Sequence, residues 1–384
     1  MLKKAGRAPL EAAREYASGR RAVGHMLTDA PVELLHAAGF FPVQIHGHYG
    51  PAGPSSRELQ SFACSYSRGS VDLLLDGSFD FLEGVVIPFI CDTTRCVDIV
   101  LRGGNPFKFV EAYRPPKSLT GPGARDYLVG EIRRLKGRLE QIAGHPITNS
   151  VLWRSIGLYN RARGLLKNFE ILRADDPQAY FDICRAFTVL PVDLFIGSLQ
   201  KAFSELRTTN YEKALMNHAA TSNPAIATDG PTDQNKVEVP IMLAGKIPEP
   251  LDLPQALKSM GVRIVADDLA MGARLFTLIV EEEGDPVEAL ADRHLKQIPF
   301  AGFLQPAEDR PDFLVRRVRE SGARGVIMLV LKFCEIFELD APEVRERLVR
   351  ENIPVLILET DTVETVSPAM RTRIEAFLEM LRHG

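Results

Sequence analysis

Short apolar runs alternate with polar, helix-forming segments along much of the chain. In the first part the short apolar runs include Phe40–Ile45 and Val85–Ile90, and within the second the β-branched Val85–Val86–Ile87 has the composition of a strand buried on both faces. After residue 236 the strand-like runs become regular, and they are Val237–Leu243, Arg263–Val265, Gly325–Leu331 and Pro354–Leu358. Each is followed by a polar or helix-starting segment. This alternation predicts parallel sheets with flanking helices, and therefore an α/β fold.

Helical spacing of apolar residues marks the segments between these runs. Tyr127–Ala143 carries such a stripe, and Gly144 supplies a stop. Residues 146 to about 215 read as entirely helical, with stretches such as Trp153–Leu166 and Pro177–Thr188, and the chain closes on a predicted helix, Pro368–Leu381. We therefore expect a first α/β domain over 1–145, a helical insert over 146–218, a polar linker over 219–236 and a second α/β domain over 237–384.

Composition narrows the class of protein without naming a function. Of the 384 residues, 45% are hydrophobic and 25% charged, and the formal net charge is −4. This balance gives no general attraction to nucleic acid or to an anionic membrane. No apolar stretch approaches the roughly 20 residues of a transmembrane helix. The basic N-terminus lacks the apolar core of a signal peptide, so we expect a cytoplasmic protein.

The candidate chemistry lies in the cysteines at positions 64, 91, 96, 184 and 334. An odd number of scattered cysteines argues against a disulfide framework. Cys91 directly follows one apolar run and Cys334 lies shortly after another, where open α/β sheets bind ligands. Cys64 precedes a predicted helix, whose N-terminus stabilises a thiolate. Three such thiolates would suit a cubane cluster with one open iron, although spacing alone leaves other triples and plain burial as alternatives.

Three cysteine segments carry a family resemblance. They read FACSYSRGSVDLLL, GVVIPFICDTTR and GVIMLVLKFCEIFELDAPEVRERLVRENIPVLILETD, and they resemble those of the 2-hydroxyacyl-CoA dehydratase and benzoyl-CoA reductase family. GEIRRLKGRLEQIAGHPITNSVLWRSIGLYNRARGLL is similar to the family's helical insert, while VPIMLAGKIPEP, GVRIVADDLAMGAR and TRIEAFLEML are similar to its second α/β domain. The resemblance covers roughly residues 20 to 384. CDTTRC places the chain nearer the reductase and dehydratase subunits than a double-cubane branch reading CDGKKK.

The resemblance implies a fold, a cofactor and partners. Two flavodoxin-like domains would surround a helical part, and Cys64, Cys91 and Cys334 match the first, second and third ligand positions of a [4Fe–4S] cluster. A homologous cluster-bearing subunit would be the partner. Separate ATP-hydrolysing activator subunits with their own cluster would supply low-potential electrons, and the substrate would be an acyl-CoA thioester. The chain itself has no Walker loop, so we do not expect it to hydrolyse ATP.

Three functions follow from this resemblance. The leading expectation is an oxidoreductase subunit of an ATP-dependent benzoyl-CoA reductase, active only with its partners and giving a cyclic dienoyl-CoA. The alternative is a subunit of an (R)-2-hydroxyacyl-CoA dehydratase that acts through a ketyl radical. The third is an electron-transfer subunit with a closed cluster, for which Cys96 is the nearest fourth ligand.

Other polar residues have both functional and structural interpretations. His46 could donate a proton to substrate, or it could lie with His48 on a surface loop. We expect Cys96 to be structural and Cys184 to belong to the core. The remaining candidates adjoin cysteines or strand ends and could tune the site or merely cap and pack; they are Ser65, Tyr66, Asp267, Asp268, Glu359 and Asp361. For Asp267 and Asp268 we favour the structural interpretation.

Overall fold

The computed structural model describes residues 1–27, 29–48, 50, 53–104, 107–209, 238–246, 252–297, 299–304, 309–360 and 365–383. The predicted linker 219–236 and Asp361 lie outside the described residues.

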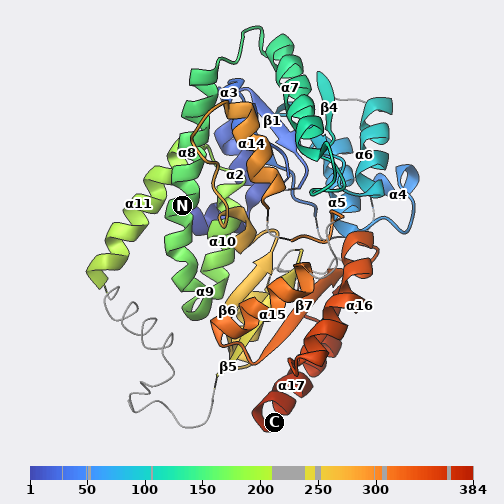
Figure 1. Cartoon of the computed structure of the whole chain (residues 1–384), viewed down its shortest axis with the longest axis vertical. Coiled ribbons are helices and arrows are strands. Elements are labelled where there is room, and N and C mark those ends of the chain that lie inside the picture. The colour runs from blue at the N-terminus through green and yellow to red at the C-terminus, as the bar shows by residue number, and fades with distance from the viewer. Residues whose placement is uncertain are drawn as a thin grey trace.

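Two four-stranded sheets form the frame of the molecule (Figure 1). The first contains β1 (Ala22–His25), β2 (Phe41–Gln44), β3 (Leu82–Pro88) and β4 (Phe109–Tyr113), in the order β2-β1-β3-β4. The second contains β5 (Val239–Gly245), β6 (Val262–Leu269), β7 (Gly325–Leu331) and β8 (Val355–Thr360), in the order β6-β5-β7-β8. Every strand pairing is parallel. The repeated order is the flavodoxin-like one, so the predicted α/β fold is confirmed.

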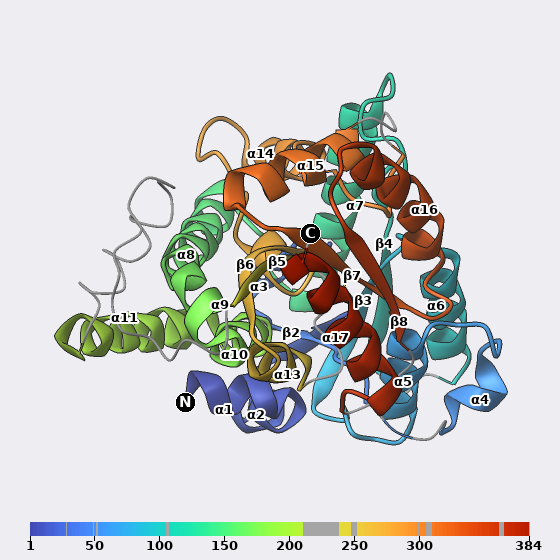
Figure 2. The same cartoon turned by 90° about the horizontal axis from the view of Figure 1, so that it is seen from below.

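Helices cover the faces of both sheets. Those before β5 are α1 (Leu2–Arg7), α2 (Pro9–Ala17), α3 (Val32–Ala37), α4 (Ser55–Glu58), α5 (Ser65–Leu75), α6 (Asp92–Gly103), α7 (Ala124–Ala143), α8 (Asn149–Asn168), α9 (Leu172–Asp175), α10 (Pro177–Phe187) and α11 (Val192–Thr209). Those after it are α13 (Leu253–Ser259), α14 (Pro286–Leu295), α15 (Asp309–Ser321), α16 (Glu335–Arg350) and α17 (Pro368–His383), several of which surround the second sheet in Figure 2. Two short 3-10 turns, Phe169–Ile171 and Ala273–Leu275, also lie among the described residues.

The two halves of the chain are interlocked by helix packing. Helix α14 follows the second sheet's β6 in sequence, but it packs against α7 and α8 beside the first sheet (Figure 1). Arg125 of α7 binds two carboxylates of α14, Asp292 at 2.7 Å and Glu288 at 3.0 Å. Helix α14 thus fixes the position of the segment that follows β6 relative to the first sheet.

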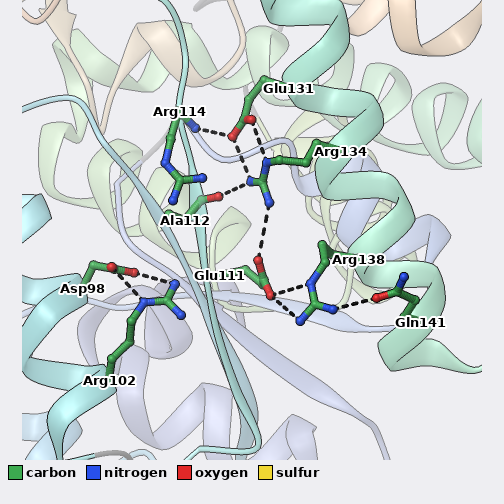
Figure 3. A network of polar contacts seen from close by, with 9 residues as sticks. All are labelled: Asp98, Arg102, Glu111, Ala112, Arg114, Glu131, Arg134, Arg138 and Gln141. Atoms are coloured by element: carbon green, nitrogen blue, oxygen red, sulfur yellow. Dashed lines mark hydrogen bonds and ion pairs between the residues drawn. The ribbon is translucent and has the colours of Figure 1, made fainter.

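A network of ion pairs joins α7 to the strand β4 (Figure 3). Arg138 donates to Glu111 of β4 at 3.0 Å, and Arg134 lies between Glu111 and Glu131. The backbone N–H of Arg114 donates to Glu131 at 2.8 Å. Because the arginines are partly exposed, each pair contributes at most about 1 kcal/mol. Together they hold α7 in register with β4.

Candidate functional site

The candidate site lies at the topological switch points of the two sheets, where the strand order reverses. In each sheet the second strand adds to one side of the first and the third strand to the other, which puts switch points between β1 and β3 and between β5 and β7. Ligands of open α/β sheets bind at such points, beyond the carboxyl ends of the strands. Segments from both switch points meet here around a single cavity of ≈ 320 Å³, a volume that includes its open mouth.

We call this space the cysteine cavity. Its lining residues are Leu27, Cys64, Ser67, Ile90, Cys91, Thr93, Thr94, Lys246, Phe333, Cys334, Glu335 and Ile336. The three cysteines singled out by sequence therefore line one space, although 270 positions separate Cys64 from Cys334 (334 − 64). Cys64 and Cys334 are buried, and Cys91 is partly exposed.

Each of these cysteines is the N-cap of a helix: Cys64 of α5, Cys91 of α6 and Cys334 of α16. At Cys91 the sulfur accepts from the backbone of Thr94 in a capping box. The N–H groups and the dipole at a helix N-terminus stabilise negative charge, which favours thiolates. The turns of Cys91 and Cys334 are also joined, because the backbone N–H of Asp92 donates to Glu335 Oε1 at 2.7 Å.

Three residues in or next to the lining of this cavity have unusual backbone conformations. Leu27 and Phe333 have positive φ angles of 61° and 64°, in the region that large side chains avoid. Gly245 has φ +125°, and a Cβ at this position would lie 2.1 Å from the carbonyl oxygen of Leu329. Strained backbone of this kind gathers at functional sites, where it holds side chains that the regular strand could not place.

The Cys64 and Cys334 thiols affect each other's pKa. The hydrogen bond from Cys334 and the charge of Lys246 lower the pKa of Cys64, whereas the neighbouring Cys64 sulfur and burial raise the pKa of Cys334. Ionisation of Cys64 is thus favoured and ionisation of Cys334 is opposed, as expected for two groups that become anionic at one site.

Lys246 is the functional residue that sequence reasoning missed. It directly follows β5, and its side chain is buried, with Nζ 4.2 Å from the centre of the Tyr66 ring. Burial opposes its charge, but the nearby Cys64 and Cys334 raise its pKa above the usual value, so it stays an ammonium ion. A lysine immediately after an apolar run was the available signal, since strand ends are where ligands bind.

The donor set fits an iron–sulfur cluster. Within the described ranges, no three His, Cys, Asp or Glu side chains are arranged to hold a single metal ion. A cluster contains several irons, so its thiolate ligands need not share one metal. The cavity offers three thiols, the ligands that clusters prefer, and a buried cation lies beside them to offset their charge.

The paired histidines lie outside the lining of the cysteine cavity. His46 Nε2 is 3.0 Å from Thr188 Oγ1, and burial lowers the pKa of His46 to about 3. His48 Nε2 is 3.0 Å from Asp72 Oδ2. Both rings have structural partners, and the role of His46 as a proton donor stays a prediction.

The other singled-out residues are placed as follows. Cys184 is fully buried in the core, which confirms the prediction for it. Cys96 lies outside the cavity lining and accepts from Gln60 Nε2 at 3.4 Å. Asp267 accepts from Tyr180 Oη at 2.9 Å and pairs with an arginine, while Asp268 pairs with two arginines, in agreement with the structural interpretation.

Near the first cysteine, Ser65 is buried beside Cys64, and Tyr66 Oη donates to the carbonyl of Ile45 at 2.7 Å. Glu359 is exposed on β8. Among the described helices, none is long and apolar enough to cross a membrane.

Comparisons with known proteins identify the family of this chain. The beta subunit of lactoyl-CoA dehydratase from Anaerotignum propionicum is 27% identical over 384 residues, covering 99% of this chain and 97% of the relative. The beta subunit of (R)-2-hydroxyglutaryl-CoA dehydratase from Acidaminococcus fermentans is 28% identical, covering 96% and 94%. A benzoyl-CoA reductase subunit from Thauera aromatica is 26% identical, covering 89% and 86%. The family described as "2-hydroxyglutaryl-CoA dehydratase, D-component" matches residues 27–381, a span that holds all three cavity cysteines, and the chain belongs to that family.

Proposed function

We propose that Cys64, Cys91 and Cys334 hold a [4Fe–4S] cluster, and that the chain is the cluster-carrying subunit of an enzyme acting on acyl-CoA thioesters. The observation that carries the proposal is the meeting of these three thiols, from both halves of the chain, at facing switch points. The relatives are themselves named as single subunits of dehydratases and of a reductase, which supports a second, related subunit as partner.

When bound, the cluster supplies single electrons at low potential. The chain's own residues hold it and shape its surroundings. The N-termini of α5, α6 and α16 favour the thiolate forms of the three cysteines, and Lys246 offsets part of their charge. The apolar side chains of Leu27, Ile90 and Ile336 limit the access of water.

The source of the electrons is proposed to lie outside this chain. An ATP-hydrolysing activator with its own cluster would dock on the enzyme and deliver them, as the family resemblance implies. A closed cluster that only relays electrons would need a fourth protein ligand. Cys96, the nearest thiol in sequence, lies outside the cavity lining, and this supports three ligands.

Two reactions fit the family. The first is the reduction of an aromatic acyl-CoA, with benzoyl-CoA giving a cyclic dienoyl-CoA. The second is the loss of water from an (R)-2-hydroxyacyl-CoA. Relatives with both kinds of name support the pair. Anaerobic assays of the reconstituted complex, with activator and ATP, would separate them: a dienoyl product from benzoyl-CoA supports the first, and an enoyl product from lactoyl-CoA supports the second.

Iron and sulfide analysis of anaerobically purified protein tests the cluster itself. We expect about four iron and four sulfide ions per chain, as a [4Fe–4S] cluster requires. Cys96→Ala is the matched control, because it removes a partly exposed thiol outside the cavity and should leave both contents unchanged. Protein without iron after anaerobic reconstitution would refute the proposal.

A further inference from the structure

A second, larger space of ≈ 1160 Å³, including its open mouth, lies beside the carboxyl ends of β1, β2 and β4. We call it the arginine cavity. Helices α8 and α14 and the segment after β6 contribute to its wall, and its lining has no residue in common with that of the cysteine cavity over the described part of the chain. Its ionisable lining residues are His25, Asp29, Glu33, Tyr113, Tyr159, Arg163, Arg274, Arg293 and His294. Side chains that line neither space must therefore hold the two walls in place.

Tyr66 connects residues that belong to the two walls. It is buried in the first turn of α5, two positions after Cys64, and it lines neither cavity itself. Its Oη accepts from the backbone N–H of Leu27, in the cysteine cavity, at 3.2 Å and donates to the carbonyl oxygen of Ile45 at 2.7 Å. Gln44, which precedes Ile45, lines the arginine cavity. The phenol therefore joins the start of α5 to the ends of β1 and β2.

The hydroxyl group of Tyr66 stabilises the strained turn after β1. Leu27 has a φ of 61°, a conformation that persists in a large residue only where neighbouring contacts fix it. Its backbone N–H donates to Tyr66 Oη, and its carbonyl oxygen accepts from His25 Nδ1 at 2.9 Å. Two side chains thus bind both polar groups of the Leu27 backbone. Because Leu27 lines the cysteine cavity, these contacts fix one part of that cavity's wall.

The ring of Tyr66 is the direct contact of the Lys246 ammonium group. Nζ lies 4.2 Å from the ring centre, which is a cation–π distance. Among the residues that the structure describes, Nζ forms no hydrogen bond and no ion pair with a carboxylate, so no such contact fixes its direction. A lysine side chain has a flexible four-carbon stem. Without the ring, the ammonium group can therefore turn away from Cys64 and Cys334, whose charges favour it where it is.

We propose that Tyr66 is a positioning residue of the cysteine cavity: its ring holds the Lys246 ammonium group beside the thiols, and its hydroxyl group fixes the turn at Leu27. The inference rests on the proposed function, because Lys246 can affect a reduction potential only if the cysteines hold a cluster. Both hydrogen-bond partners of the hydroxyl group are backbone groups of other strand ends. Tyr66 therefore acts on the potential through the charge of Lys246, which the ring keeps close to the thiols and shields from water.

A redox titration of the anaerobically reconstituted full-length chain, followed by electron paramagnetic resonance, tests this role. Tyr66→Leu removes the ring and should shift the equilibrium toward the oxidised cluster by at least about threefold, or about 30 mV for one electron. Tyr66→Phe keeps the ring and should restore the potential of the unaltered chain. Tyr127→Leu is the matched control, because Tyr127 is 52% exposed and lies outside the cavity lining, and it should leave the potential unchanged.

A double variant separates positioning from a general loosening of the fold. If Tyr66 acts through Lys246, Tyr66→Leu should cause almost no further shift of the potential in a Lys246→Met chain. A purely structural role would shift the potential equally in both backgrounds. If Tyr66→Leu does not retain its cluster, acetic anhydride labelling of Lys246 in the cluster-free chain carries the test. Mass spectrometry should show labelling at least about threefold faster in Tyr66→Leu, and no change in Tyr66→Phe.

Three outcomes would overturn the inference: an unchanged potential in Tyr66→Leu with its cluster intact, an equal shift with and without Lys246, or unchanged labelling of Lys246 in the cluster-free variant. None of them affects the cluster proposal, which iron analysis tests separately. A lack of iron in the unaltered chain would instead count against that proposal, and the labelling experiment would still report on the contact between Tyr66 and Lys246.

Discussion

The cysteine cavity and the arginine cavity both lie at carboxyl ends of parallel strands, yet their walls carry different chemistry. The smaller one gathers three thiols around one buried ammonium group, without a carboxylate in hydrogen-bond contact with that group in the described structure. The larger one gathers guanidinium, carboxylate and imidazole groups. The end of β1 contributes to both, because His25 lines the arginine cavity and Leu27 the cysteine cavity.

This difference indicates that the two cavities beside the end of β1 have different roles. Soft sulfur donors with strained backbone suit a resident metal cluster. Guanidinium groups cannot bind a metal, and the Glu33 carboxylate is already paired with two of them. If the roles differ in this way, each cavity should respond to its own substitutions and not to those of the other.

The largest expected effect is the loss of the proposed cluster from the cysteine cavity. Cys64→Ala, Cys91→Ala and Cys334→Ala should each reduce the bound iron to background, because a cluster anchored by three thiolates loses one anchor. Iron and sulfide analysis after anaerobic reconstitution measures this effect. Cys184→Ala, which removes a core thiol outside the cavity, is the control and should keep its iron. Iron retained by Cys334→Ala would show that the third ligand is misassigned.

Much of the cysteine cavity could be predicted from the sequence. The run Gly325–Leu331 is β7 as predicted, and the cysteine that follows it lies at a helix N-terminus. The predicted helix over Tyr127–Ala143 begins earlier, at Ala124, because Gly123 in the left-handed region starts it, and Gly144 ends it as predicted. Local patterns were sufficient for these elements because strand ends and glycines act within a few residues, whereas the choice of Cys64, Cys91 and Cys334 among the five cysteines came from the family resemblance.

The arginine cavity could not be predicted in this way. Glu33 and Arg163 are 130 positions apart in the sequence (163 − 33), and neither lies in a motif. Their pairing depends on how α3 packs against α8, which no local pattern encodes. Strand β1, which is followed closely by Leu27 of the cysteine cavity, is only 4 residues long and too short for a periodic signal.

The next largest effect concerns stability at the arginine cavity. Arg163→Met removes the close partner of Glu33, whose side chain is fully buried, and leaves its charge to Arg293 at 3.9 Å. Loss of one partner of a buried pair costs about 3–5 kcal/mol in free energy of unfolding. Urea denaturation measures this cost. The double variant Glu33→Leu with Arg163→Met should recover most of it, and a double variant as unstable as the single one would contradict the ion-pair argument.

Acid should weaken the protein through its buried histidines. Burial lowers the folded-state pKa of His25 to about 4, against about 6.5 in the unfolded chain. Between these pH values the unfolded chain binds a proton at His25 that the native chain does not. The contribution of His25 to the free energy of unfolding is therefore fully present above about pH 6.5 and is lost as the pH drops toward 4. His25 alone contributes about 1.4 kcal/mol per pH unit over this window.

Urea denaturation at several pH values measures this contribution. His46 and His294, whose pKa values burial also lowers, should likewise reduce the free energy of unfolding as the pH falls. Asp29 should have the opposite effect, because burial raises its pKa to about 6. The comparison of His25→Gln with the unaltered chain cancels these shared contributions. The variant should show a shallower decline between pH 6 and pH 4.5, and identical slopes would argue against a neutral, buried His25.

Lys246 should tune the cluster rather than hold it. Lys246→Met removes the buried positive charge beside the thiolates, which destabilises the reduced, more negative cluster. We expect the reduction potential to fall by on the order of 60 mV, the tenfold equivalent for one electron. A redox titration followed by electron paramagnetic resonance measures it. Lys246→Arg keeps the charge and should restore most of the potential; a potential unchanged in Lys246→Met would place the ammonium group outside the electrostatic reach of the cluster.

The smallest effect belongs to the network of Figure 3, which provides a contrast for both cavities. Arg138 pairs with Glu111 at 3.0 Å, but its side chain is 47% exposed, so water can replace the lost contact. Arg138→Gln should therefore cost less than about 1 kcal/mol in urea denaturation, and it should leave the iron content unchanged. A cost near that of Arg163→Met would mean that solvent exposure does not distinguish these two arginines.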